Sequence, residues 1–246
     1  MNSDITNHLL RLNQDFYDTY AKSFSSTRYT IQPGIRRLLP QLVNAENLLD
    51  LGCGNGNLAQ SLLDAGFSNN YLGMDNSKSL LTHAINNIPE NERVRFTFQQ
   101  SDLAVEVDEP ADMLCFDTVV SFAVLHHFPA DYFLNRFFEY AKRNLAPNGK
   151  LFISCWQVKN NQRLKSRLQP WSVLGIDQEE LDEGDLLLDW RAEPSQPARY
   201  RYVHHYDSET LTMTGNKVGL KLSEEYYSDG KEGDLALYQV WNKPLG

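Results

Sequence analysis

The sequence predicts an α/β fold in which a mainly parallel sheet carries helices on both faces. An apolar segment at residues 48–51 runs into three glycines at alternate positions, and a helical pattern follows at once. Short apolar segments then alternate with longer helical patterns, which is typical of βαβ units. Residues 116–121 are almost entirely apolar, as expected for a central strand covered on both faces.

Apolar periodicity and capping residues set the expected helices. Leu9, Leu12 and Phe16 recur at three- and four-residue steps, which predicts a long first helix. Ser77 and Ser208 each precede a helical pattern and are suited to the N-cap position. We therefore expect helices over residues 5–25, 34–42, 57–65, 78–87, 130–145 and 209–217.

The expected strands cover residues 48–51, 71–74, 94–98, 116–121, 150–156, 199–206, 220–227 and 235–242, with a turn at 147–149. We expect one domain over residues 1–246 with four parts. These are an N-terminal helical cap (1–44), a cofactor-binding core (45–156), a variable, partly helical insertion (157–200) and a C-terminal part of the sheet (201–246). The insertion is basic near residues 159–167, where the side chains could contact phosphates. It is acidic over residues 177–189, which we interpret as a solvated face.

The glycine loop indicates a ligand that approaches bare backbone. Glycine adopts positive φ and leaves no Cβ in the way of a ligand. The spacing at Gly52, Gly54 and Gly56 differs from the G-x-G-x-x-G of dinucleotide sites, and Asp50 precedes it. Both features favour a ligand that brings no phosphate to this turn. Cys53 lies inside the loop, where we expect a small packing residue rather than a nucleophile.

Two further carboxylates follow the next strands. Asp75 ends the second strand about twenty residues after the glycines, where a carboxylate can accept two hydrogen bonds from a ribose diol. Asp102 follows the third strand and could accept a hydrogen bond from an exocyclic amine of a purine.

Composition sets limits on function. The chain has 246 residues and a formal net charge of −9, so any nucleic acid would have to meet a local basic patch or a partner's charge. Three scattered cysteines fit neither a disulfide framework nor a zinc site, and we expect no metal and a reducing, cytoplasmic setting. No apolar run approaches the length of a membrane span.

Together, the D-x-G-x-G-x-G loop, the acidic residue after strand two and the S-D-L after strand three resemble class I S-adenosylmethionine-dependent methyltransferases. The resemblance covers about residues 45–156. It implies a Rossmann-like sheet of seven strands, mainly parallel with an antiparallel last strand, and S-adenosylmethionine as cofactor. By this resemblance Asp50 and the glycines line the methionine end, Asp75 takes the ribose, Asp102 with Leu103 takes the adenine, and Phe122 flanks the cofactor.

The core therefore contributes the following expected cofactor-binding residues: Asp50, Gly52, Cys53, Gly54, Gly56, Asp75, Asn76, Ser101, Asp102, Leu103, Ser121, Phe122 and Ala123.

The turn after strand four bears on the methyl acceptor. Enzymes that methylate exocyclic base amines carry an Asn/Asp-Pro-Pro-aromatic tetrapeptide there, whereas this chain has S-F-A-V-L-H-H-F at residues 121–128. The Pro-Cys pair of cytosine-carbon methylation is also absent from the sequence. A carboxylate acceptor is already ionised at neutral pH, so it needs alignment and a cation rather than a general base. The pair His126-His127 either packs and caps the turn or contacts substrate or cofactor.

A narrower resemblance extends over most of the chain. Residues 16–29 are similar to the opening of the tRNA wobble-uridine methyltransferases, which esterify the carboxylate of 5-carboxymethyluridine. Residues 121–128, 147–156, 169–171 and 201–206 resemble further segments of that family in the right order. The resemblance implies a tRNA anticodon loop as substrate and, as in eukaryotic members, a small activating partner subunit.

The same resemblance makes Arg28, Arg201 and His204 candidates to hold the acceptor carboxylate or the methionine carboxylate, with His126 in the turn as a further catalytic candidate. Tyr17, Arg28 and Tyr29 would line the cofactor end. For residues 201–206 the alternative is an ordinary edge strand. Two other functions stay open: methylation of a carboxylate, hydroxyl or amine on a small metabolite, and a catalytically silent cofactor-binding subunit.

Overall fold

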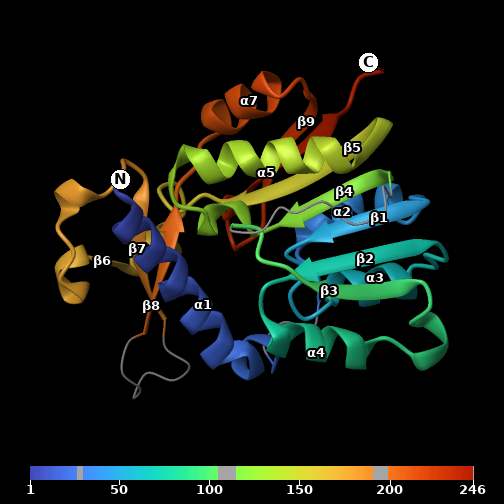
Figure 1. Cartoon of the computed structure of the whole chain (residues 1–246), viewed down its shortest axis with the longest axis horizontal. Helices are drawn as coiled ribbons and strands as arrows, with labels where there is room; N and C mark the ends of the chain where they lie inside the picture. The colour runs from blue at the N-terminus through green and yellow to red at the C-terminus, as the bar shows by residue number, and fades with distance from the viewer. Residues whose placement is uncertain (27–29, 105–114, 191–198, 246) are drawn as a thin grey trace.

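The computed structural model describes residues 1–26, 30–104, 115–190 and 199–245. Its centre is a seven-stranded sheet with the order β3-β2-β1-β4-β5-β10-β9 (Figure 1). The strands are β1 (Asn47–Leu51), β2 (Asn70–Asp75), β3 (Phe96–Gln100), β4 (Phe116–Phe122), β5 (Leu145–Trp156), β9 (Lys221–Ser228) and β10 (Ala236–Asn242). The first five pair in parallel, and β10 is antiparallel to both β5 and β9. The predicted fold class is confirmed.

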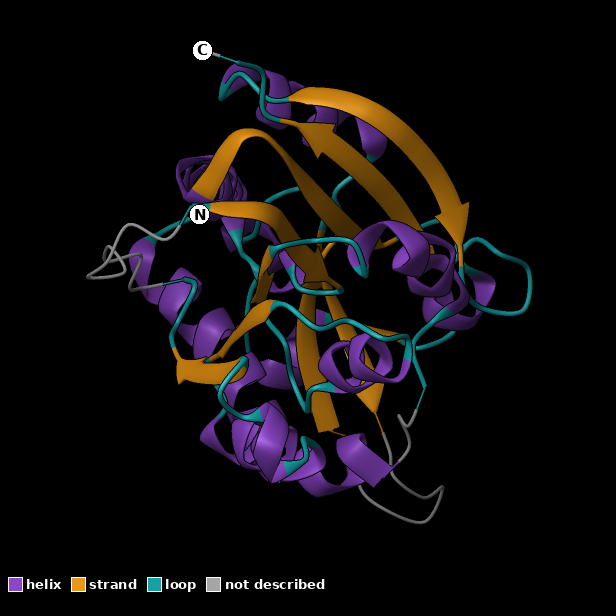
Figure 2. Cartoon of the chain, turned by 90° about the vertical axis from the view of Figure 1, so that its right-hand side faces the viewer, coloured by secondary structure: helices purple, strands orange, loops and turns teal. Residues whose placement is uncertain are grey.

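Helices cover both faces of this sheet. On one face, α5 (Ala130–Asn144) and α7 (Ser208–Lys217) bury Phe138 and Leu211 in the same core as Trp241 of β10. On the other face, α2 (Pro33–Leu42) and α3 (Asn57–Asp64) bury Leu38 and Leu62 in a second core. Helix α4 (Lys78–Asn87) packs along β2 and β3. Figures 1 and 2 show these layers.

A second, three-stranded sheet lies beside the main one. It has the order β6-β7-β8, with β6 (Leu168–Gln169), β7 (Asp185–Trp190) and β8 (Arg199–His204). Residues 157–200 are partly helical, as expected, but they also contribute β6 and β7. Residues 201–204, which we expected to belong to the main sheet, lie instead in β8 of this small sheet. Asp185 and Asp189, on either side of three consecutive leucines, hid β7 inside an acidic run. A short helix, α6 (Gln162–Lys165), leads into this sheet.

Helix α1 (Ser3–Ser26) lies across the small sheet and connects it to the core (Figure 1). Leu9 packs with Trp171, Leu187 and Tyr202 in a small apolar cluster. Although α1 is 24 residues long, none of the described helices combines the length and apolar character needed to cross a membrane.

Several element ends differ from the expectation. Strand β3 begins two residues later than predicted, at Phe96. Asp207, rather than Ser208, caps α7, because its carboxylate accepts a hydrogen bond from the Thr210 backbone at 2.8 Å. Residues 147–149, expected as a turn, form a wide bulge within β5, where Asn148 has a φ of +63° and pairs with Lys243.

Four short 3₁₀ turns complete the described structure: η1 (Glu90–Glu92), η2 (Leu125–His127), η3 (Trp171–Leu174) and η4 (Gln178–Glu180).

Replacing Leu9 with alanine is expected to lower the free energy of unfolding by about 2–5 kcal/mol, because the leucine is fully buried between α1 and the small sheet. Urea unfolding measures the change. Met213→Ala is the control, since that side chain is 62% exposed and its loss should change stability by at most ~0.5 kcal/mol. Equal effects of the two substitutions would contradict the packing of α1 on this sheet.

Candidate functional site

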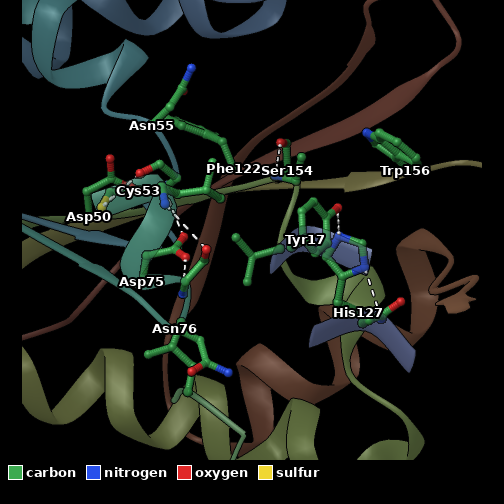
Figure 3. Close-up of a pocket in the computed structure, with 18 of the residues that line it drawn as sticks. Tyr17, Asp50, Cys53, Asn55, Asp75, Asn76, Phe122, His127, Ser154 and Trp156 are labelled. Carbon is green, nitrogen blue, oxygen red and sulfur yellow. Dashed lines mark hydrogen bonds between the residues drawn. The ribbon is translucent and has the colours of Figure 1, made fainter. Parts of the chain in front are cut away.

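A cavity of about 530 Å³ lies at the carboxyl ends of the parallel strands. From β1 the chain builds outward to β2 and β3, and then returns to add β4 and β5 on the other side of β1. Such a reversal of strand order leaves a crevice where ligands bind in open α/β sheets. The glycine loop after β1, the ends of β2 and β4, and one face of α1 line the cavity (Figure 3).

The three loop glycines have positive φ but different surroundings. A Cβ on Gly52 would come within 2.3 Å of Val124, so glycine lets the loop approach the turn after β4. A Cβ on Gly54 would meet nothing within 4 Å, and Gly54 lines the cavity, so bare backbone faces open space. A Cβ on Gly56 would come within 2.9 Å of Ala84, so this glycine serves the contact of α3 with α4.

The loop end of the cavity is acidic. Asp75 accepts hydrogen bonds from the backbone of Gly54 and of Ser77, both at 2.9 Å. Burial raises the pKa of Asp75, those two backbone hydrogen bonds oppose the rise, and the neighbouring charge of Asp18 adds to it. Asp50 accepts a hydrogen bond from the Tyr71 hydroxyl at 2.6 Å. Burial raises the pKa of Asp50 to about 7, against the effect of that hydrogen bond.

Next to this end, Asp102 is held in place by its neighbours. One carboxylate oxygen accepts from the Asn76 amide at 3.2 Å, and the other accepts from the Ala104 backbone at 2.9 Å. Ser101, Leu103 and Asn76 also line the cavity here. The carboxylate is therefore presented on a fixed turn after β3.

At the opposite end, Tyr17 and His127 belong to one hydrogen-bond chain. The Tyr202 backbone donates to Asn13 Oδ1 at 2.9 Å, which fixes the amide so that its nitrogen faces His127 Nδ1 at 3.3 Å. Because His127 Nδ1 then accepts, a neutral ring carries its proton on Nε2 and donates to the Tyr17 oxygen at 2.8 Å. Both ring nitrogens of His127 are thus engaged within the protein.

Arg201 lies behind this end of the cavity. Its guanidinium carbon is 4.5 Å from the centre of the Trp156 ring and 5.5 Å from that of Phe16, and it forms a hydrogen bond with Tyr17. Trp156 and Tyr17 line the cavity, whereas Arg201 does not. Burial lowers the pKa of Arg201, and contact with Tyr17 partly restores it. A cation therefore lies directly behind the aromatic wall.

The structure brings together most of the residues that the sequence singled out, although their individual roles stay predictions. Twelve line the cavity: Tyr17, Asp50, Gly52, Cys53, Gly54, Asp75, Asn76, Ser101, Asp102, Leu103, Phe122 and Ala123. Five others do not: Gly56, Ser121, His126, Arg201 and His204. Arg28 and Tyr29 lie outside the described residues.

The residues that do not line the cavity have clear structural contacts. Ser121 donates to the backbone of Leu51 at 2.8 Å and ties the ends of β4 and β1 together. His126 is fully buried, stacks on Trp156 and accepts a hydrogen bond from the Trp156 backbone. His204 Nδ1 lies 2.7 Å from Asp185, which also accepts from the Tyr202 hydroxyl, so His204 holds β8 to β7.

Sequence reasoning missed other residues of the cavity. On α1 they are Asn7, Leu10, Arg11, Asn13, Gln14 and Asp18, and elsewhere Ser154, Trp156, Asp229 and Tyr238 are prominent. His127, which the sequence offered only together with His126, also lines the cavity. The α1 residues recur at three- and four-residue steps, so a polar helical face was available as a signal. Asp229 could be assigned to the cavity only from the structure, in which it accepts hydrogen bonds from the backbone of Gly34 and from the Tyr238 hydroxyl.

The cavity fits S-adenosylmethionine, the cofactor expected from the sequence. That molecule carries positive charge on its sulfonium and ammonium groups, which suits the end occupied by Asp50, Asp75 and Asp18. The open space at Gly54 admits it against bare backbone. In the described residues, no group of three or more His, Cys, Asp or Glu could hold a metal ion.

Comparison with known proteins decides the family. A profile described as a methyltransferase domain matches residues 24–225 of this chain. The chain belongs to this methyltransferase-domain family. With the fold and the cavity, this confirms the prediction of an S-adenosylmethionine-dependent methyltransferase, and an enzyme is favoured over a silent cofactor-binding subunit.

Two relatives carry a more specific activity name. The Arabidopsis thaliana tRNA (carboxymethyluridine(34)-5-O)-methyltransferase is 29% identical over 158 residues, which are 64% of this chain and 35% of that protein. The Xenopus tropicalis protein with the same activity name is 31% identical over 147 residues, 60% of this chain and 21% of that protein. This chain thus spans about a third or less of the length of these relatives.

Three solved structures share the fold. An S-adenosylmethionine-dependent methyltransferase from Mesorhizobium loti has a TM-score of 0.61 at 20% identity, covering 85% of this chain and 96% of its own. The N-methyltransferase NodS of Bradyrhizobium japonicum, bound to S-adenosylhomocysteine, has 0.57 at 16%, covering 87% and 89%. A chain of the Haloferax volcanii complex between the Trm112 activator and a methyltransferase has 0.64 at 16%, covering 94% and 97%.

Cofactor binding is expected to depend on pH through Asp50. A cationic ligand favours the ionised carboxylate, so affinity should rise as the pH passes upward through about 7, and binding near that pH should release protons. The stability of the free protein should change in the opposite direction. Folded Asp50 holds its proton more tightly than Asp50 in the unfolded chain does. Its contribution to the free energy of unfolding therefore decreases as the pH rises from about 4 to about 7.

Calorimetry with S-adenosylmethionine in buffers of different ionisation enthalpy measures both effects. Asp50→Asn cannot titrate at this position, so its affinity should vary less with pH than that of the wild type. An identical pH dependence in the two proteins would show that Asp50 is not the responsible group.

Proposed function

We propose that this methyltransferase esterifies the carboxylate of a modified wobble uridine in a tRNA anticodon loop. The observation that carries the proposal is the opposite charge at the two ends of the cavity. Asp50, Asp75 and Asp18 make one end acidic, whereas Arg201 lies behind Tyr17 and Trp156 at the other. A cationic methyl donor and an anionic acceptor suit those ends, respectively.

The reaction would need little acid–base chemistry from the protein. S-adenosylmethionine supplies a methyl group on a sulfonium sulfur, which an ionised carboxylate can attack directly. The chain's residues would align the two reactants and exclude water. Every described carboxylate and imidazole lining the cavity already has a hydrogen bond to the protein: Asp18, Asp50, Asp75, Asp102, Asp229 and His127.

The aromatic walls of the cavity would suit a planar ring. Tyr17, Phe122, Trp156 and Tyr238 all line the cavity, from four different elements. Enzymes that act on a nucleobase bind it outside the stack, between aromatic or apolar side chains. An anticodon-loop base is single-stranded, so little base pairing has to be broken to reach such a pocket.

The relatives support the same acceptor. The Arabidopsis and Xenopus proteins are named for methylation of carboxymethyluridine at tRNA position 34. In this proposal Arg201 neutralises the acceptor carboxylate, with Arg28 as a further candidate from the sequence. His204 and His126 contribute through the packing of β8 and of Trp156.

We also propose that a small activating subunit assists the enzyme. A chain of the Haloferax volcanii complex that contains the Trm112 activator has the same fold as this chain. The alternative acceptor, a small metabolite, is favoured by the formal charge of −9, because nucleic-acid binding usually relies on basic surface.

Nucleoside mass spectrometry of tRNA tests the function. Incubation of the purified chain with S-adenosylmethionine and tRNA bearing 5-carboxymethyluridine, with and without an activator subunit, should give the methyl ester. Efficient esterification of the free nucleoside or of other small carboxylates, with none of tRNA, would favour the metabolite alternative.

Arg201→Gln is expected to lower kcat/KM for tRNA about tenfold or more, because it removes the positive charge that lies behind the Tyr17 and Trp156 wall and favours the acceptor carboxylate. The affinity for S-adenosylmethionine, measured by calorimetry, should change little and so reports intact folding. Arg201→Lys, which keeps the charge, should retain part of the activity. Arg37→Gln, a cation on α2 paired with Glu224, is the control. A loss of cofactor affinity as large as the loss in kcat/KM would contradict a role at the acceptor end.

A further inference from the structure

The tip of the hairpin between β9 and β10 contributes a buried carboxylate to the wall of the cavity. Asp229 directly follows β9, lines the cavity and is 4% exposed. Its φ of +71° is uncommon for a residue other than glycine. Removing a carboxylate from water is costly unless hydrogen bonds or opposite charges compensate it. A hydrogen-bonded carboxylate on the wall of a ligand cavity is therefore a candidate for ligand recognition.

A backbone group and a hydroxyl group of the protein hold this carboxylate. One oxygen of Asp229 accepts a hydrogen bond from the Gly34 backbone at 2.8 Å, and the other accepts from the Tyr238 hydroxyl at 2.6 Å. Gly34 lies in the first turn of α2, where the helix dipole favours negative charge. A carboxylate can accept about four hydrogen bonds, so a ligand that carries an N–H group can donate a further one.

The partners of Asp229 are themselves fixed. The Tyr238 ring stacks on Tyr226, with 5.1 Å between the ring centres, and its centre is 6.1 Å from that of Phe122. The Tyr226 hydroxyl donates to the Gly34 carbonyl at 2.8 Å. A Cβ on Gly34 would come within 2.3 Å of the Tyr238 ring, so glycine is needed for α2 to approach the hairpin this closely. The carboxylate is therefore held in place before a ligand arrives.

The order of the strands places Asp229 away from the loop end of the cavity. Asp75 ends β2, and four strand spacings, roughly 19 Å, separate β2 from β10 in the sheet. Tyr238, which donates to Asp229, belongs to β10. In the same strand, Ala236 lies opposite Trp156 of the aromatic wall. Asp229 is therefore far from the carboxylate that we expect to bind the ribose and close to the aromatic wall.

The proposed reaction determines how a uracil ring has to lie. The carboxymethyl group on C5 points to the cofactor, which we expect at the ends of β1 and β4, so the rest of the ring extends toward β5 and β10. Uracil carries a hydrogen on its ring nitrogen N3, whereas cytosine carries a lone pair there. A carboxylate accepts a hydrogen bond from the first and repels the second. A carboxylate on the β10 side can therefore distinguish the two bases.

We propose that Asp229 determines the base specificity of the enzyme by accepting a hydrogen bond from the N3–H group of the acceptor uracil. The inference rests on the proposed function, which supplies the uridine. The ring lies against Phe122, Trp156 and Tyr238, and Gly34 and Tyr238 are positioning residues for the carboxylate. A base without the N3 hydrogen is rejected, because it leaves the buried carboxylate facing a lone pair.

The negative charge of Asp229 is compatible with an acceptor that is itself a carboxylate. C5 and N3 are separate positions of the uracil ring, so the ring holds the two carboxylates apart. The N-terminus of α2 compensates Asp229, whereas Arg201 behind Trp156 favours the acceptor carboxylate. The two negative groups thus have different positive partners.

Binding of fluorescent RNA stem-loops to the full chain tests the inference by anisotropy, with S-adenosylhomocysteine present so that no methyl transfer occurs. One RNA carries 5-carboxymethyluridine at the wobble position, and the other carries 5-carboxymethylcytidine. The wild type is expected to bind the uridine RNA about tenfold or more tightly. In Asp229→Asn the amide oxygen can still accept from Gly34, and the NH₂ group can donate to the cytosine N3, so the preference should disappear or reverse.

Asp117→Asn is the matched control. Asp117 accepts from the backbone of Glu46 and of Asn47 at 3.1 and 2.6 Å, at the start of β1 and so at the edge of the sheet opposite to the cavity. This variant should keep the wild-type preference. The affinity for S-adenosylmethionine, measured by calorimetry, reports the fold of both variants. An equal preference in Asp229→Asn and in the control would overturn the inference, as would a wild type that binds the two RNAs equally.

A third RNA tests the wild type alone, so the inference does not depend on the folding of a variant. It carries 5-carboxymethyl-3-methyluridine, in which a methyl group replaces the N3 hydrogen. This RNA is expected to bind about tenfold or more weakly than the uridine RNA. Binding as tight as that of the uridine RNA would contradict a hydrogen bond from N3.

Esterification of the uridine RNA is scored separately with S-adenosylmethionine, so the two hypotheses can fail independently. If the base preference depends on Asp229 but no ester forms, the base-recognition site stands and the proposed function fails. If the ester forms and Asp229→Asn keeps the wild-type preference, the proposed function stands and the base-recognition site fails.

Discussion

The side-chain amide of Asn13 fixes helix α1 against both of its neighbours. Its oxygen accepts from the Tyr202 backbone in the small sheet, and its nitrogen donates to His127 in the turn after β4. A buried amide has to satisfy both ends, so α1 has one favourable register between these two elements. The same register places Tyr17 and Asp18 in the cavity. This buried side chain therefore helps to position groups at both ends of the cavity.

The small sheet acts on the site through that helix. Leu9 and Phe16 face the sheet, whereas the cavity-lining residues of α1 lie on an adjacent face of the same helix. The Asp185–His204–Tyr202 contacts hold β7 and β8 together beneath α1. A segment that looks like a variable insertion in the sequence thus supports one wall of the cavity, and it supplies Arg201 behind that wall.

The sequence predicted best what depends on neighbouring residues. The glycine loop, the Ser77 cap and the carboxylate at Asp75 are properties of short segments, and all three lie as expected. Which of His126 and His127 faces the cavity depends on the orientation of the 3₁₀ turn that carries both. The structure places His127, rather than the predicted His126, on the cavity.

What the sequence missed depends on distant partners. The pairing of His204 with Asp185 spans 19 positions, and nothing local distinguishes it from a catalytic histidine. Strand β7 was hidden because Asp185 and Asp189, on either side of three leucines, made it look like part of a charged, solvated run. Its acidic start, Asp185, is instead buried, because the His204 and Tyr202 side chains satisfy its oxygen.

The net charge of this protein and the local charge around its cavity determine different interactions. The total of −9 governs long-range interactions in dilute salt, but at physiological ionic strength a charge acts over about 8 Å. Within that range an anion at the Trp156 wall is close to Arg201, whereas a cation at the loop meets Asp50, Asp75 and Asp18. An acidic chain can therefore place a cation at one end of a cavity whose other end is acidic. The separation exists because Asp50 and Asp75 belong to β1 and β2 of the main sheet, whereas Arg201 belongs to β8 of the small sheet.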